Sequence, residues 1–562
     1  MECLDARRLT GPNVLMDSPG SVLDVACSKD ECDAVLPAWA AAVRQLLAEL
    51  DWSVAPLCYR PLNGGVSLAF GAPIDVLYAA TELNELAFDM AAAKLAGNPV
   101  ADYAARVAAI RAEAAAEANP ALLELQAAAN RSGVTLLWDD DAVSLGMGAS
   151  ARTWATRHLP AVTALDFSAF ANVPVALVTG TNGKTTTARL VRHIALAAGY
   201  TPGLCSTDWI AIGEDIVDYG DWSGPGGARS VLRNNGSDLA ILETARGGLL
   251  RRGLGVERAD VAVITNIAED HFGDFGSRNL HELLDIKWLV TRAVEAAGTL
   301  ILNADDVLLV DKARDYKGDI CWFGLDPNSA VLRKQIAAGR PAFALAGHDL
   351  VELRGGMQRV LCRDDEIPIT LGGAARHNVA NALAAAAACS ALGFERKQIA
   401  AGLCSVSQDM NPGRCNIYEL PHCRVLVDFA HNTHALQAVF DVSRALPARR
   451  RILAFGQAGD RTDEEIRSLA ASAWAIGLDH VIVSQLEKYA RGREPGEVFE
   501  LIRDALLQEG AKPSQIEQHE FEMQSLDAAL ARAQQGDLVI MLALAEAAGV
   551  RQRLAELAGG SA

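Results

Sequence analysis

One ten-residue segment constrains this chain more than any other feature, and it reads VTGTNGKTTT from Val178 to Thr187. An apolar run, Pro174–Val178, precedes it, and a helical pattern closed by Gly199 follows it. A glycine-rich turn between a strand and a helix predicts a phosphate-binding loop, because its backbone N–H groups and the helix N-terminus converge on phosphate oxygens. The spacing departs from G-x-x-x-x-G-K-[ST], since Val178 occupies the first glycine position. The predicted nucleotide-binding residues of this loop are Gly180, Thr181, Asn182, Gly183, Lys184, Thr185 and Thr186.

Short apolar runs alternate with helical stretches on the C-terminal side of this loop. Two of them, Leu239–Leu242 and Val261–Ile264, predict further strands of the same sheet. A second series begins near Asn411, and its predicted strands are 424–427, 451–454, 481–483 and 538–542. Strands that alternate with helices indicate mostly parallel sheets covered on both faces. The loop Asn411–Arg414 is a plausible hinge between the two sheets.

The first 170 residues have a different composition. They are rich in alanine, and the stretch Asn98–Asn130 consists almost entirely of helix formers, with Pro120 as a break or first-turn residue. We therefore expect a largely helical N-terminal domain over 1–170, a central ATP-binding α/β domain over 171–410 and a C-terminal α/β domain over 411–562.

Composition excludes several classes of protein. The net charge of −19 argues against nucleic acid or an anionic membrane as the main partner. No run of about 18 apolar residues predicts a membrane span, and the N-terminus does not resemble a signal peptide, so the expected location is the cytoplasm. The eleven cysteines contain no C-x-x-C pair, which disfavours a zinc site and predicts small thiols in a reducing compartment.

The loop variant GTNGKTTT resembles that of the Mur ligase family, which includes folylpolyglutamate synthetases. Further family positions follow in order: Glu243 at a strand end, Thr265-Asn266, Asp270-His271 and then Lys287. The resemblance implies that Thr185, Glu243 and His271 bind Mg²⁺ beside ATP. It also implies a catalytic role for Lys184, Glu243, His271 and Lys287. Lys287 is either carbamylated to hold a second metal or unmodified, offering positive charge to the reacting phosphate.

The same resemblance extends the ATP site beyond the loop. The stretches NADD and HNVAN resemble adenine and ribose contacts, and the C-terminal domain contributes its own share. The residues implied are Asn303, Asn378, Asn381, Arg414, Asp428 and His431. The implied fold is a P-loop ATPase domain followed by a Rossmann-like domain.

Longer stretches are similar to the Mur-ligase part of cyanophycin synthetases, over about 390 residues from Val173 onward. They include GDWSGPGGAR from Gly220, ETARGG from Glu243 and YARGREPGE from Tyr489. Residues 127–151 resemble the lead-in to the ATP-grasp domain of those synthetases. Only about 20 residues then separate it from the phosphate-loop strand, so the ATP-grasp domain is expected to be missing.

The resemblance implies an amide ligase that phosphorylates a carboxylate with ATP and joins it to an amine. The expected acceptor is an aspartyl-type carboxylate, held by Arg229, Arg246, Arg251 or the adjacent Arg252, and the expected amine is arginine or a similar amino acid. A homo-oligomer, dimer or tetramer, is expected by resemblance. One alternative is a peptidoglycan-precursor or folate ligase, and the GDWSGPGGAR and YARGREPGE stretches argue against both. The other is a nucleotide-binding scaffold or regulatory partner that has lost catalysis.

Overall fold

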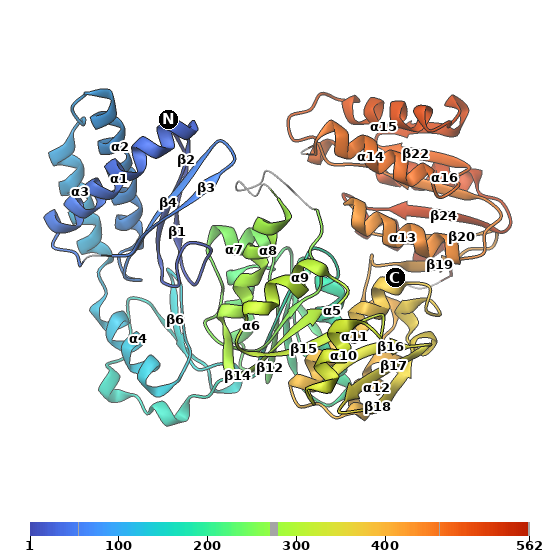
Figure 1. Ribbon diagram of the computed structural model, residues 1–562, viewed down its shortest axis with the longest axis horizontal. Coiled ribbons are helices and arrows are strands. Elements are labelled where there is room, and N and C mark those ends of the chain that lie inside the picture. The colour runs from blue at the N-terminus through green and yellow to red at the C-terminus, as the bar shows by residue number, and fades with distance from the viewer. Residues whose placement is uncertain (54, 270–278, 460, 560–562) are drawn as a thin grey trace.

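The computed structural model describes residues 1–53, 55–269, 279–459 and 461–559, and its three regions are distinct in Figure 1. The N-terminal region is drawn in blue to cyan, the middle region in green to yellow and the C-terminal region in orange to red. Within the described ranges, no helix is long and apolar enough to cross a bilayer.

The N-terminal region is a mixture of sheets and helices, so the expectation of a largely helical domain is wrong. An antiparallel sheet in the order β1-β2-β4-β3 packs against α1, α2 and α3. A second antiparallel sheet, β5-β6-β7, packs with α4. The elements are β1 (Glu2–Leu9), β2 (Gly20–Ala26), α1 (Lys29–Glu49), β3 (Leu57–Leu62), β4 (Gly65–Gly71), α2 (Leu77–Ala96), α3 (Tyr103–Glu117), α4 (Pro120–Ser132), β5 (Leu136–Trp138), β6 (Ala142–Leu145) and β7 (Arg152–Ala155).

The helix formers around Pro120 behave as their composition predicts. They form the consecutive helices α3 and α4, and Pro120 occupies the first turn of α4, where its missing N–H is not needed. Strands β2 and β4 were missed because almost all their residues are buried, including the polar Ser21, Asp24 and Ser67, so polar and apolar residues do not alternate between an exposed and a buried face. A short segment that is buried on both faces cannot be distinguished from a buried helix by periodicity.

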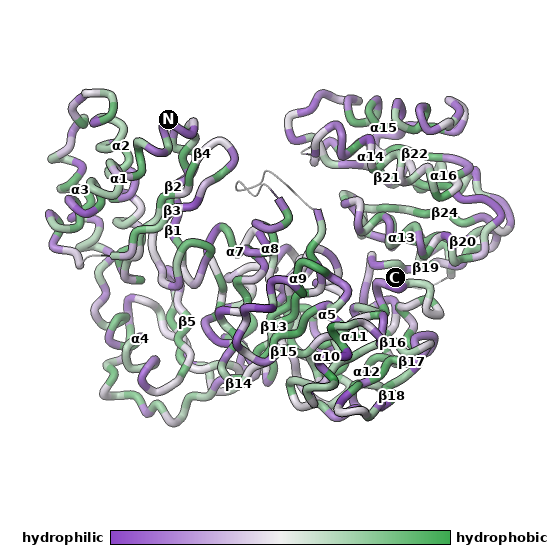
Figure 2. Tube along the Cα trace, viewed as in Figure 1, coloured by the Kyte–Doolittle hydropathy of each residue, from purple (hydrophilic) through white to green (hydrophobic). Residues whose placement is uncertain are grey.

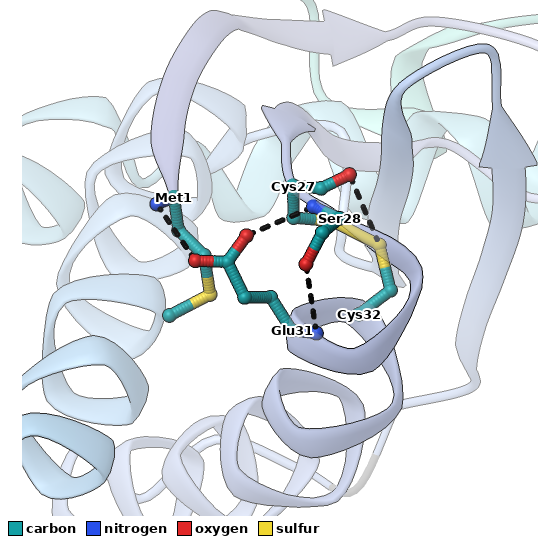
Figure 3. The surroundings of a disulfide bond; sticks show 5 residues. All are labelled: Met1, Cys27, Ser28, Glu31 and Cys32. Atoms are coloured by element: carbon teal, nitrogen blue, oxygen red, sulfur yellow. Dashed lines mark hydrogen bonds and ion pairs between the residues drawn. A yellow bond between two sulfur atoms is a disulfide. The ribbon is translucent and has the colours of Figure 1, made fainter.

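A disulfide between Cys27 and Cys32 corrects the expectation that the cysteines are all free thiols (Figure 3). Cys27 follows β2 and Cys32 lies in the first turn of α1, so the tight strand-to-helix connection brings their Cα atoms to 5.9 Å. Between them, Ser28 and Glu31 form a capping box, and Glu31 also receives the N-terminal amine of Met1 at 3.5 Å. The remaining cysteines of the described residues are free, and most of them are buried.

The middle region is built on a mixed sheet whose described strands follow the order β11-β10-β9-β12-β8-β13-β14-β15-β16-β17-β18. Strands β9 to β16 of this order run parallel, whereas both ends of the sheet are antiparallel hairpins. The strands are β8 (Val175–Thr179), β9 (Pro202–Cys205), β10 (Trp209–Ile212), β11 (Asp215–Tyr219), β12 (Leu239–Glu243), β13 (Ala259–Ile264), β14 (Val294–Asn303), β15 (Asp319–Gly324), β16 (Ala342–Ala346), β17 (Asp349–Arg354) and β18 (Met357–Arg363).

Helices cover both faces of this sheet, as the continuous apolar strands require. One face packs against α5 (Lys184–Ala197), α11 (Arg376–Ala391) and α12 (Arg396–Ser405). The other packs against α6 (Pro225–Leu232), α7 (Arg246–Arg251), α8 (Leu280–Trp288), α9 (Val307–Lys312) and α10 (Ala330–Ala337). Figure 2 shows the hydrophobic segments following the strands between these two layers.

The C-terminal region is a smaller α/β unit with the described strand order β19-β20-β24-β21-β22-β23, parallel except for the β19–β20 hairpin. Its strands are β19 (Asn416–Glu419), β20 (Cys423–Asp428), β21 (Arg451–Phe455), β22 (His480–Ser484), β23 (Ile516–His519) and β24 (Asp537–Leu542). Its helices are α13 (Thr433–Ala445), α14 (Asp463–Trp474), α15 (Glu497–Gln508), α16 (Glu522–Arg532) and α17 (Ala547–Leu557). The strands predicted in both α/β series are confirmed.

Candidate active site

The phosphate loop leaves the central strand β8 and enters α5 at Lys184. Strands on both sides of β8 continue the sheet, so the loop lies at a switch point where ligands of α/β sheets bind. Two of its glycines have positive φ: +146° at Gly180 and +84° at Gly183. A Cβ at Gly180 would lie 1.9 Å from Thr265 Oγ1, and one at Gly183 would lie 2.2 Å from Asn381 Oδ1. Both positions therefore require glycine for their conformation and for the closeness of their neighbours.

The end of β13 holds the loop in this shape. Asn266 accepts a hydrogen bond from Asn182 N at 3.0 Å and donates one to Asn182 O at 2.9 Å. Thr265 Oγ1 donates to the same carbonyl at 2.6 Å. The Thr265-Asn266 pair thus fixes the backbone of the loop from the neighbouring strand.

Glu243 lies at the carboxyl end of β12 and is 1% exposed. Its Oε1 accepts a hydrogen bond from Thr185 Oγ1 at 3.1 Å, and its Oε2 accepts one from Thr207 N at 3.3 Å. Burial raises the pKa of the carboxyl, whereas the positive charges of Lys184, Arg189 and Arg414 oppose that rise. Thr207 was not predicted, because the four-residue strand β9 before it gives a weak sequence signal.

Two lysines donate hydrogen bonds to backbone carbonyls of the loop. Lys184 Nζ donates to the carbonyl of Thr181 at 3.0 Å. Lys287, on α8 and 3% exposed, donates from Nζ to the carbonyl of Gly180 at 2.7 Å. Lys287 therefore contacts the first glycine of the loop from α8.

The donor atoms beside the loop suit a hard divalent cation. Thr185 and Glu243 present a hydroxyl and a carboxylate oxygen, the ligand types that Mg²⁺ prefers. His271, the third predicted ligand, lies outside the described residues. Among the residues that are described, no group of three or more His, Cys, Asp or Glu side chains forms a metal cluster.

The C-terminal region reaches the loop directly. Asn182 and Asn432 exchange amide hydrogen bonds of 3.3 and 3.1 Å, and Asn182 Nδ2 lies 2.9 Å from His434 Nδ1. Asn432 is also the N-cap of α13, where its Oδ1 accepts from Ala435 N at 2.8 Å. This pair was not predicted, since asparagine is so often a helix cap that its sequence carries no sign of a distant partner.

The predicted hinge is tied to α5 by polar contacts. Asn411 contacts Arg189 at 3.3 Å and Thr186 at 3.2 Å. Arg189 also donates to Asp208 at 2.5 Å and stacks 3.9 Å from the centre of the Trp209 ring. Burial lowers the pKa of Arg189 to about 10.

The predicted C-terminal nucleotide residues lie next to this hinge. Arg414 stacks 4.7 Å from the centre of the Phe429 ring and lies 3.8 Å from Asp208. Asp428 accepts from Cys415 N at 2.7 Å and so stabilises the left-handed backbone of Cys415, whose φ is +54°. The ring of His431 lies 3.0 Å from the carbonyl oxygen of Phe429.

The predicted adenine and ribose residues already have partners in the protein. Asn303 donates to Thr265 O at 3.0 Å and accepts from Asp305 N at 2.9 Å. Asn378 is buried, donates to Ile369 O at 2.8 Å and accepts from Asn381 at 3.2 Å. Asn381 packs beside Gly183, so of these three only its side chain is in contact with the phosphate loop.

The four candidate substrate arginines separate into two groups. Arg246 and Arg251 begin and end α7, the helix that follows Glu243. Arg229 instead pairs with Asp139 of the N-terminal region at 3.5 Å, and Arg252 donates to Arg8 O at 3.2 Å. Arg246 and Arg251 therefore lie on the helix that follows the strand of Glu243, whereas Arg229 and Arg252 contact the N-terminal region.

Comparison with known proteins assigns both α/β regions. Residues 178–389 match the Mur ligase middle domain, and residues 413–543 match the Mur ligase glutamate ligase domain. A cyanophycin synthetase of Trichormus variabilis is 38% identical over 375 residues, which are 66% of this chain but 41% of that protein. The chain thus spans less than half the length of that relative.

Two further relatives are more distant. The UDP-N-acetylmuramoyl-L-alanyl-D-glutamate–2,6-diaminopimelate ligase of Geobacillus kaustophilus is 29% identical over 65% of this chain and 72% of its own. A crystal structure of MurF from Acinetobacter baumannii superimposes with a TM-score of 0.50 at 18% identity, over 68% of this chain and 77% of that one. The last comparison supports the fold only.

Proposed function

Because this chain belongs to the Mur ligase family of ATP-dependent acid–amino acid ligases, we propose that it phosphorylates a substrate carboxylate and couples it to an amine. The observation that carries this proposal is the convergence of Lys184, Thr185 and Glu243 at the switch point of the sheet. A loop lysine, a hydroxyl and a buried carboxylate there are the groups that phosphoryl transfer from a nucleotide requires.

In the first step a carboxylate oxygen bonds to the γ-phosphorus of ATP while the bond to the ADP oxygen breaks. Lys184 and the N–H groups of the loop stabilise the charge on the transferred group. Thr185 and Glu243 would hold Mg²⁺, with His271 by resemblance, and the bound ion supplies positive charge to the phosphate oxygens.

In the second step the amine nitrogen bonds to the acyl carbon and gives up a proton, and phosphate leaves with the electron pair of the broken C–O bond and can accept that proton. Acyl phosphates react with water, so the site must exclude it. The contact between Asn182 and Asn432 supports a role for the C-terminal domain in covering the loop, with Asn411–Arg414 as the hinge.

Substrates are assigned by similarity and by the position of α7. Arg246 and Arg251 follow the strand that carries Glu243, so they are our candidates to hold an aspartyl-type acceptor carboxylate through bidentate contacts. The proposed amine is arginine or a similar amino acid, as the similarity to cyanophycin synthetases suggests. We also propose, by the same similarity, that the protein forms a homo-oligomer, either a dimer or a tetramer.

The segment before the middle domain supports a single ligation reaction. Between the lead-in stretch and β8 the chain forms β7 and two short 3-10 turns. This part of the chain supplies no second nucleotide-binding domain, so we propose that the protein acts on an acceptor made elsewhere. The alternative of a catalytically inactive scaffold predicts nucleotide binding without turnover.

Phosphate release from Mg-ATP tests the proposal. The purified protein would be assayed with free aspartate, aspartyl dipeptides, polyaspartate or glutamate, each paired with arginine, lysine, ornithine or ammonia. We expect release that needs both an acceptor and an amine, and that Lys184→Ala abolishes. Lys397→Ala, on the exposed side of α12, is the matched control and should retain full activity. ATP binding without release for any pair would support the scaffold instead.

A further inference from the structure

A cavity of about 320 Å³ lies between the N-terminal region and the middle domain, away from the phosphate loop. Its walls come from α4 and β5 on one side and from α6 and residues 254–258 on the other. Residues 254–258 lead into the first residue of β13, so the cavity lies near the amino ends of the strands, whereas the loop lies at their carboxyl ends. Its volume is within the range of small-molecule sites.

Arg229 lines this cavity with an incompletely satisfied guanidinium. Its Nε lies 3.5 Å from Asp139 Oδ2, but Arg233 is closer to that oxygen, at 2.5 Å. Among the described residues, no hydrogen bond to the Arg229 side chain is found. Burial lowers the pKa of Arg229, which reflects the cost of holding this cation with so few partners. An anion in the cavity would supply the hydrogen-bond acceptors that Asp139 does not provide to Arg229.

Two further polar groups in the cavity wall also lack partners in the described part of the chain. The hydroxyl of Thr135 is buried and makes no hydrogen bond. Glu257 is exposed to solvent at the cavity wall, its carboxylate makes no hydrogen bond or ion pair with the described residues, and desolvation raises its pKa. Buried polar groups in proteins are nearly always paired, so the hydroxyl of Thr135 is the group for which a ligand would supply a missing partner.

Strand β5 adds backbone groups to the same wall. It is an edge strand of its sheet, and in the described part of the chain it pairs with β6. Leu136, Leu137 and Trp138 line the cavity, and the Leu137 carbonyl accepts a 3.4 Å hydrogen bond from Arg233. An edge strand presents N–H and C=O groups that an extended backbone can pair with.

We propose that this cavity is a second binding site, for an amino acid or the end of a short peptide that carries both a carboxylate and a cationic nitrogen. Arg229 receives the carboxylate and Glu257 the cationic group, while Thr135 and the edge of β5 bind the polar backbone between them. This site is separate from the ligation site, so it can exist whether or not the proposed reaction occurs.

Isothermal titration calorimetry on the full-length protein without nucleotide tests the site. The probes are L-arginine and L-alanyl-L-arginine, with agmatine, which lacks the carboxylate, and N-acetylalanine, which lacks the cation. We expect saturable binding of the first two and at least about tenfold weaker binding of the others, since each loses one charge-assisted contact. Tighter binding of L-arginine would indicate a site for a free amino acid, and tighter binding of L-alanyl-L-arginine would indicate a site for a peptide end.

Substitutions in the cavity wall test whether the binding heat comes from a ligand in this cavity. Arg229→Gln and Glu257→Gln should each weaken binding at least about tenfold. Arg131→Gln and Glu124→Gln, exposed on α4 beside the cavity, should not change it. Lys184→Ala should bind as well as the wild type, which separates this site from the phosphate loop. Binding unaffected by both cavity variants, or no saturable binding up to about 10 mM ligand, would overturn the proposal.

Discussion

Alanine at Gly183 tests whether the phosphate loop depends on close packing against α11 rather than on backbone conformation alone. Gly183 has φ +84°, and Gly199, at the end of α5, has φ +86°. Alanine at either position adopts a left-handed backbone, which costs about 1 kcal/mol. A Cβ at Gly199 meets nothing within 4 Å, whereas one at Gly183 would lie 2.2 Å from Asn381 Oδ1. Gly199→Ala is therefore a control with the same backbone strain and no steric conflict.

The extra cost at Gly183 comes from Asn381. Its side chain is 6% exposed and donates to Asn378 Oδ1 at 3.2 Å, so it can move away only by losing that buried hydrogen bond. Overpacking costs about 1–3 kcal/mol and the lost bond about 1 kcal/mol. We expect Gly183→Ala to reduce the free energy of unfolding by about 3–5 kcal/mol, compared with about 1 kcal/mol for Gly199→Ala.

Urea unfolding followed by tryptophan fluorescence measures these differences, and ATP binding provides a second measurement. Gly183→Ala should weaken ATP binding, and Gly199→Ala should leave it unchanged. In an Asn381→Ala background the conflict is removed, so Gly183→Ala should then cost only about 1 kcal/mol. Equal destabilisation by the two glycine substitutions, or the same cost in both backgrounds, would refute the reasoning.

Two further predictions concern the C-terminal domain. Asn432→Ala removes both the cap of α13 and the contact with Asn182, so it should lower the stability of this domain by about 1 kcal/mol and also reduce ATP turnover. Asn432→Asp keeps the cap acceptor and should reduce turnover alone; unchanged turnover in both variants would contradict a role for this contact. Desolvation raises the pKa of Glu517, but hydrogen bonds from His519, Arg532 and His480 bring it down to about 2. A carboxyl group whose pKa is lower in the folded than in the unfolded state stabilises the fold at pH values above its unfolded pKa. This stabilisation is lost as the pH falls toward the folded pKa of about 2. Glu517→Gln should therefore lower the free energy of unfolding by about 1 kcal/mol at pH 7, after allowance for solvent screening, and by much less near pH 3. Thermal unfolding of both proteins at the two pH values checks this, and a cost that does not fall with pH would contradict it.

The parallel part of the fold could be predicted because strands, loops and helices alternate and glycine residues mark the boundaries between them. Strand β8 is followed by glycines that force a turn and then by a helical pattern, so three independent signals agree. The N-terminal sheets had no such agreement, since β2 and β4 are buried on both faces next to alanine-rich helices. The edge hairpin β10–β11 was missed because its strands are only four and five residues long.

Some residues of the candidate site could be predicted from the sequence, and others could not. Glu243 and the loop residues could be placed from sequence because the carboxyl ends of parallel strands meet at one edge. Arg229 lies close in sequence to the GDWSGPGG stretch, but sequence does not show that its side chain extends from α6 toward the N-terminal region. Contacts between residues about 250 positions apart, such as Asn182 with Asn432, depend on how two domains pack and carry no local signal.

The segment that follows β1 connects the N-terminal region to the middle domain through backbone hydrogen bonds. Thr10 N donates to Arg252 O at 2.8 Å, and Leu254 N donates to Pro12 O at 2.7 Å, so the segment after β1 is bonded backbone to backbone with the middle domain. Gly11 and Gly253 approach so closely that a Cβ on either would lie within 2.6 Å of the other segment. A protease that cut the chain once near residue 172 would therefore release no independent piece: the two fragments would stay together as a non-covalent pair until denaturant broke these bonds.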